Sequence, residues 1–109
     1  MEKAALLILR LGRWPTWTPY VIASMQTNVL VRFYFASNRP PTGISACKNC
    51  MWLPTNANDL RLRIAKYLNL TNVGSFTKNR LCDMKPMWLL LFSRELHGHS
   101  WIGYVDLDV

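Results

Sequence analysis

The stretch Thr-Asn-Val-Leu-Val-Arg-Phe-Tyr-Phe-Ala, residues 27–36, carries the clearest structural signal in the sequence. Every second side chain is apolar, and these side chains share one face of an extended strand: Val29, Val31, Phe33 and Phe35. Alternation with a period of two indicates a β-strand, and β-branched and aromatic residues favour that conformation. The Asn38–Gly43 segment, with two consecutive prolines, then ends the strand.

Two segments C-terminal to this strand are predicted to be helices. In residues 59–71, Asn58 can cap the first turn, and the helix would bury a stripe of four side chains: Leu60, Ile64, Tyr67 and Leu68. The alternation of Leu and Arg over residues 60–64 leaves a strand as the alternative. Residues 86–97 begin with a proline and are followed by a glycine, which are typical helix boundaries.

The remaining segments give weaker signals. Residues 2–12 are rich in Ala and Leu and predict a further helix, and residues 14–20 predict an aromatic loop interrupted by prolines. Residues 44–58 are expected to be irregular, whereas residues 101–109 alternate weakly and predict a terminal strand. We therefore expect one small α+β domain spanning residues 1–109, with much irregular structure.

The composition is unusual for a globular domain. Charged residues make up only 17% of the 109 residues, against a usual share of about 25%, and five residues are tryptophan. The formal net charge is +7, and the positive charge is concentrated in residues 1–82. Few charged side chains beside so much apolar bulk predict poor solubility and only a weak commitment to a single packed fold.

The N-terminal segment raises the question of targeting. Residues 1–13 combine an apolar run with Lys3, Arg10 and Arg13, which suits a mitochondrial presequence or an amphipathic segment better than a secretory signal. An intracellular location is therefore expected over secretion. The best candidate for a membrane span, Tyr20–Ala36, contains Arg32, so no transmembrane helix is expected.

Cysteine and histidine provide the candidates for a metal site. Cys47 and Cys50 are three positions apart, which allows two thiolates to bind one zinc ion or to form a redox dithiol. Cys82 and either His97 or His99 could supply the two further ligands that a tetrahedral zinc site needs. Because these residues come from distant segments, we expect neither a metal nor any other cofactor, and an odd number of cysteines does not indicate a disulfide framework.

Basic residues on and after the predicted helix 59–71 are the candidates for nucleic-acid binding. They are Arg61, Arg63, Lys66, Lys78 and Arg80. Arg63 and Lys66 should point away from the apolar stripe, and nearby aromatic rings could stack on bases. No spacing typical of a nucleic-acid-binding module accompanies them.

No catalytic motif is present in the sequence: there is no glycine-rich phosphate loop, no nucleophile elbow and no matched pair of carboxylates. We therefore expect a small basic, non-enzymatic protein without an identifiable biochemical activity, as the product of a dubious reading frame would be. Two alternatives follow from the charge and the aromatic residues. One is binding of a polyanion such as RNA or DNA, and the other is peripheral association with an anionic membrane surface or with mitochondria.

Overall fold

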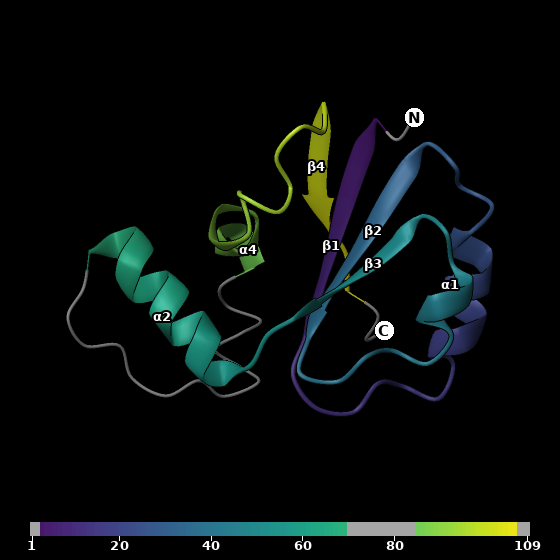
Figure 1. Cartoon of the computed structure of the whole chain (residues 1–109), viewed down its shortest axis with the longest axis horizontal. Helices are drawn as coiled ribbons and strands as arrows, with labels where there is room; N and C mark the ends of the chain where they lie inside the picture. Colours follow the sequence, from purple (N-terminus) through teal and green to yellow (C-terminus); the bar gives the residue numbers. More distant parts are fainter. Residues whose placement is uncertain (1–2, 70–84, 107–109) are drawn as a thin grey trace.

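The computed structural model describes residues 3–69 and 85–106. Its four strands are β1 (Ala4–Arg10), β2 (Val31–Ser37), β3 (Cys50–Pro54) and β4 (Trp101–Tyr104). They form one sheet in the order β3-β2-β1-β4, and each neighbouring pair is parallel (Figure 1). The prediction of a small domain that mixes helices and strands is confirmed, and the parallel sheet is an arrangement typical of α/β proteins.

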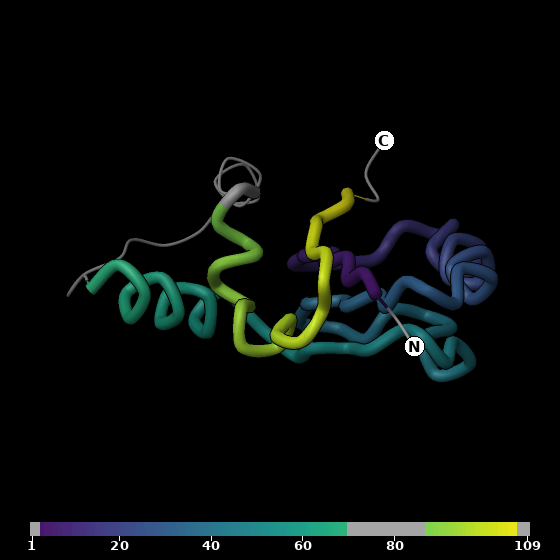
Figure 2. Tube along the Cα trace, turned by 90° about the horizontal axis from the view of Figure 1, so that it is seen from above, coloured from purple at the N-terminus to yellow at the C-terminus, as the bar shows by residue number. Residues whose placement is uncertain are grey.

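The helices connect the strands across the two faces of the sheet. They are α1 (Thr18–Met25), the short 3-10 helix η1 (Ile44–Ala46), α2 (Ala57–Leu68) and α4 (Lys85–Leu91). Figure 2 shows the strands lying between α1 and the α2–α4 pair. This arrangement follows from the parallel pairing, because each parallel connection must return the chain to the opposite end of the sheet.

Strand β1, one of the two inner strands, has apolar side chains on both faces. Ala5, Leu7 and Leu9 pack with the buried side chains of α2 and α4, whereas Ile8 packs with α1. The predicted helix over residues 2–12 is therefore wrong. A strand covered on both faces contains a nearly continuous apolar run instead of an alternating one, and that run is easily confused with a helix in the sequence.

Three further predictions need correction. The strand predicted for residues 27–36 begins only at Val31, because the Asn28 to Val31 turn leaves Val29 and Leu30 exposed. The loop predicted for residues 14–20 overlaps the start of α1, whose first turn accommodates Pro19. The segment 44–58, predicted to be irregular, contains η1, the edge strand β3 and the start of α2.

The other predicted elements are confirmed with shifted boundaries. The helix predicted for residues 59–71 is α2, and the side chain of Asn56, not that of Asn58, accepts a hydrogen bond of 2.7 Å from the Asp59 backbone N–H. Tyr67 and Leu68, which were predicted to complete its buried stripe, are half exposed. Helix α4 covers the first half of the predicted 86–97 helix, and β4 lies within the predicted terminal strand.

Candidate functional site

The sheet changes direction between β1 and β4. From β1 the chain proceeds to β2 and then β3 on one side, and it later returns to place β4 on the other side of β1. Because all four strands are parallel, their carboxyl ends lie at the same edge of the sheet (Figure 1). In open parallel sheets, the crevice outside the carboxyl ends at such a switch point is where ligands bind.

The loop after β1 is held in place at this edge by the end of β2. The Gly12 backbone N–H donates a hydrogen bond of 2.8 Å to Asn38 Oδ1, and Gly12 itself has a φ of +102°. The Trp14 indole Nε1–H donates a 2.7 Å bond to the Arg39 carbonyl oxygen. The Trp14 ring also meets Phe35 edge-on, with the ring centroids 5.6 Å apart. These contacts fix the loop relative to the sheet.

Charged residues gather on the segments that leave this edge. Arg10 ends β1 and its Nε–H donates to the carbonyl oxygen of Arg13, while Arg13 and Arg39 are exposed on the two loops. On the other side of the switch point, Asp106 follows β4 by two residues, and the intervening Val105 N–H donates to the Leu7 carbonyl oxygen. Two guanidinium groups and one carboxylate thus lie on the two segments at the switch point, and the Arg39 guanidinium lies on the neighbouring loop after β2.

The sequence prediction missed these four residues because it misassigned β1. A usable signal was present: two apolar stretches, residues 4–9 and 31–36, lie roughly one strand–helix–strand repeat apart. Had both been recognised as parallel strands, Arg10 and Arg39 would have been placed at their carboxyl ends.

The predicted zinc ligands do not converge in the described part of the chain. Cys47 and Cys50 form a disulfide, so in this state the pair lacks the two thiolates that the zinc interpretation requires. Within residues 3–69 and 85–106, three or more potential metal-binding side chains of His, Cys, Asp or Glu are nowhere grouped together. Cys82 lies outside the described residues.

The two histidines have different surroundings. His97 is exposed near the end of the turn that follows α4, and its backbone N–H donates to the Arg94 carbonyl oxygen. His99 Nε2 lies 3.0 Å from the Tyr34 hydroxyl oxygen, and the two rings meet edge-on. His99 therefore packs against the sheet next to β4 and away from the disulfide.

Arg63, a predicted nucleic-acid ligand, makes several contacts within the protein. Its guanidinium contacts Asp59 at 2.9 Å and Glu95 at 2.8 Å, donates to the Leu91 carbonyl oxygen, and lies 4.3 Å from the centre of the Phe92 ring. The pKa of Arg63 is raised, chiefly by its hydrogen bond to Glu95, so the guanidinium stays charged wherever the protein is folded. Arg63 thus connects α2 to α4 and to the turn that follows α4.

Of the other predicted nucleic-acid ligands, Lys66 lines one cleft together with Arg63. Arg61 and Lys66 are exposed on α2. Lys78 and Arg80 lie outside the described residues.

The comparisons with known proteins place the chain in a family. The model described as "Family of unknown function (DUF6625)" matches residues 6–109. The chain belongs to this family. No curated protein and no solved structure matches it.

The match to DUF6625 covers α1, all of β2–β4 and most of β1, and therefore both sides of the switch point. The family carries no assigned function, in agreement with the sequence prediction that no activity can be named. Among the described residues of this DUF6625 chain, none of the helices has the length and apolar character needed to span a bilayer.

Proposed function

We propose that the carboxyl edge of the sheet binds the phosphate groups of a nucleotide-type ligand at the switch point between β1 and β4. The observation that carries the proposal is the strand order β3-β2-β1-β4 in a fully parallel sheet. This topology separates the loops that follow β1 and β4, and the crevice between such loops is the usual ligand site of open α/β sheets.

The charges next to the switch point suit an anionic ligand. A guanidinium group presents several N–H donors in a plane and can hold a phosphate through two parallel hydrogen bonds. Arg13 and Arg39 are exposed on adjacent loops, which are joined by the Trp14 indole hydrogen bond to the Arg39 carbonyl oxygen. The sequence predicts that this basic chain binds polyanions. The proposal narrows that prediction to the binding of phosphate at the carboxyl edge of the sheet.

Asp106 suggests a divalent cation as part of the complex. A carboxylate near a phosphate would repel it unless a cation lies between them, and Mg²⁺ is commonly held by one or two carboxylates together with ligand phosphates. Asp108 follows two positions later in the sequence, outside the described residues. The expectation of a non-enzymatic protein stays untested.

Titration calorimetry with nucleoside diphosphates, with and without Mg²⁺, tests the proposal. We expect binding that Mg²⁺ strengthens, and a loss of about tenfold or more in affinity for Arg13→Met and Arg39→Met, since each removes charge-assisted hydrogen bonds. Asp106→Asn should abolish the Mg²⁺ effect. Arg61→Met, on the exposed face of α2, is the matched control and should bind normally. Absence of binding at millimolar ligand, or an equal loss in the control, would contradict the proposal.

Binding of a nucleic acid through α2 has weaker support. Its central candidate, Arg63, is already engaged by two carboxylates and a carbonyl oxygen. If RNA nevertheless binds with a steep salt dependence that Arg61→Met reduces, the polyanion alternative would be favoured over the nucleotide site. Peripheral membrane association stays a prediction of the sequence.

A further inference from the structure

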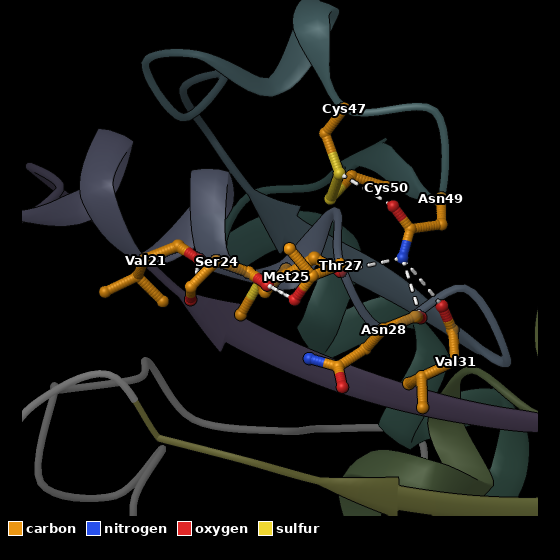
Figure 3. The surroundings of a disulfide bond; sticks show 9 residues. All are labelled: Val21, Ser24, Met25, Thr27, Asn28, Val31, Cys47, Asn49 and Cys50. Atoms are coloured by element: carbon orange, nitrogen blue, oxygen red, sulfur yellow. Dashed lines mark hydrogen bonds between the residues drawn. A yellow bond between two sulfur atoms is a disulfide. The ribbon is translucent and has the colours of Figure 1, made fainter.

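The Cys47–Cys50 disulfide lies where the loop after η1 enters the edge strand β3 (Figure 3). It closes a loop of only four residues, and so short a loop removes little conformational freedom from the unfolded chain compared with a long one. The bond is therefore poorly placed to act mainly as a stabilising crosslink, and its surroundings suggest a different role.

Asn49 lies between the two cysteines in the sequence, and hydrogen bonds of its amide nitrogen fix its side chain. Asn49 is 8% exposed, and Nδ2 lies 2.9–3.0 Å from three backbone carbonyl oxygens, those of Met25, Asn28 and Val31. Because all three partners are acceptors, the amide nitrogen must face them. The amide oxygen is consequently held on the opposite side, toward Cys47 (Figure 3).

Asn49 Oδ1 lies 3.2 Å from Cys47 Sγ, which is hydrogen-bonding distance for a thiol. A disulfide sulfur carries no hydrogen and cannot donate, so this contact becomes a hydrogen bond only when Cys47 is reduced. The buried acceptor therefore favours the protonated thiol form of a reduced Cys47.

The two cysteine residues differ in their exposure to solvent. Cys47 is 4% exposed, whereas Cys50 is only partly buried at the start of the edge strand. Thiol–disulfide exchange requires an attacking thiolate to reach one sulfur while the other leaves. Cys50 is the more exposed residue of the pair, so we take its sulfur as the point of attack. Cys47 leaves as a thiolate and, once it is protonated, can donate a hydrogen bond to Asn49 Oδ1.

We propose that this pair is a reversible thiol-modification site, at which a small thiol of the glutathione class adds to Cys50. The thiolate attacks Cys50 Sγ, the Cys47–Cys50 bond breaks, and the Cys47 sulfur leaves with the electron pair and takes up the proton that the small thiol has lost. The products are a mixed disulfide on Cys50 and a Cys47 thiol that donates to Asn49 Oδ1. No external oxidant is needed, because one disulfide is exchanged for another.

The experiment exposes the folded full chain to reduced and oxidised glutathione, followed by acid quenching, alkylation and peptide mass spectrometry, which distinguishes these cysteines from Cys82. With oxidised glutathione, Cys47→Ser should acquire the adduct on Cys50 at least about tenfold faster than Cys50→Ser acquires it on Cys47, because accessibility governs the reaction. Both variants keep one cysteine of the pair, so each is the other's matched control.

Two further measurements separate this proposal from a purely structural disulfide. The reduced wild type should retain its far-ultraviolet circular dichroism, and its infrared S–H band should show a hydrogen-bonded component that disappears in Cys47→Ser. The proposal would be overturned if the disulfide is reduced only in denaturant or if the protein unfolds upon reduction. It would also be overturned if the adduct forms on Cys47 as fast as on Cys50. Nucleotide binding is not used in any of these measurements.

Discussion

Arg63 illustrates how one partly buried charged residue can connect two helices in a protein in which charged residues are scarce. Its guanidinium contacts carboxylates from two elements, and it lies against the Phe92 ring, which is fully buried. The ion pairs are only partly buried, so each contributes modestly, but the guanidinium also satisfies the Leu91 carbonyl oxygen at the end of α4. Together these contacts fix α2 beside α4.

Replacing Arg63 tests this arrangement. We expect Arg63→Met to lower the free energy of unfolding by about 1–3 kcal/mol, because it leaves Glu95 without its partner and the Leu91 carbonyl oxygen without this donor. Urea denaturation measures the change. Arg61→Met, two positions away and exposed, should change stability by less than about 0.5 kcal/mol. Equal stabilities of the two variants would show that Arg63 is an ordinary surface residue.

The start of α2 provides a second test at the residue scale. The sequence allowed Asn58 as the cap, whereas in the structure Asn56 Oδ1 accepts from the Asp59 N–H. Asn56→Ala should therefore destabilise the protein by about 1 kcal/mol, and Asn58→Ala by clearly less. Thermal denaturation of the two variants side by side decides between them, and a larger effect at Asn58 would favour the cap inferred from sequence.

At the scale of elements, the sequence predicts best where one face of an element is polar. Helix α2 shows the expected pattern, with Leu60 and Ile64 buried and Arg61 and Lys66 exposed. Strand β1 shows the opposite case, because both of its faces are covered. Its apolar residues therefore follow neither a two-residue alternation nor a 3.6-residue period. Single-sequence patterns cannot distinguish such a strand from a helix.

The candidate site was missed for the same reason. Its residues are brought together by parallel pairing, which links segments far apart in the sequence. Arg10 lies opposite Ser37 in the β1–β2 register, and Asp106 follows the strand that pairs with β1 on the other side. Only the order of the strands reveals that these residues share one edge.

A core substitution in β1 tests its assignment as an inner strand of the sheet. Ile8 is 2% exposed and packs with α1, so Ile8→Ala should lower the free energy of unfolding by about 2–4 kcal/mol. Leu62→Ala, on the exposed face of α2, is the control and should have little effect. If both variants unfold at the same urea concentration as the wild type, residues 4–10 are not part of the core, as expected for a targeting segment.

At the scale of the whole molecule, two apolar clusters lie on opposite faces of one sheet. The first joins β1 and β2 to α2 and α4, and the second joins the same strands to α1 and the Cys47 loop. Packing on both faces of the sheet stabilises a single fold, although the composition predicts only a weak preference for one. Because β1 and β2 contribute to both clusters, the two layers should unfold together in a single transition.

Amide hydrogen exchange of the native protein, followed by NMR, tests this account most directly. Strand β1 is paired on both sides and covered on both faces, so its amides from Leu6 to Leu9 should exchange the most slowly, through global unfolding, together with those of β2. Exchange of the β1 amides as fast as that of exposed loops, while β2 remains protected, would contradict the central position of this strand and with it the β1–β4 switch point.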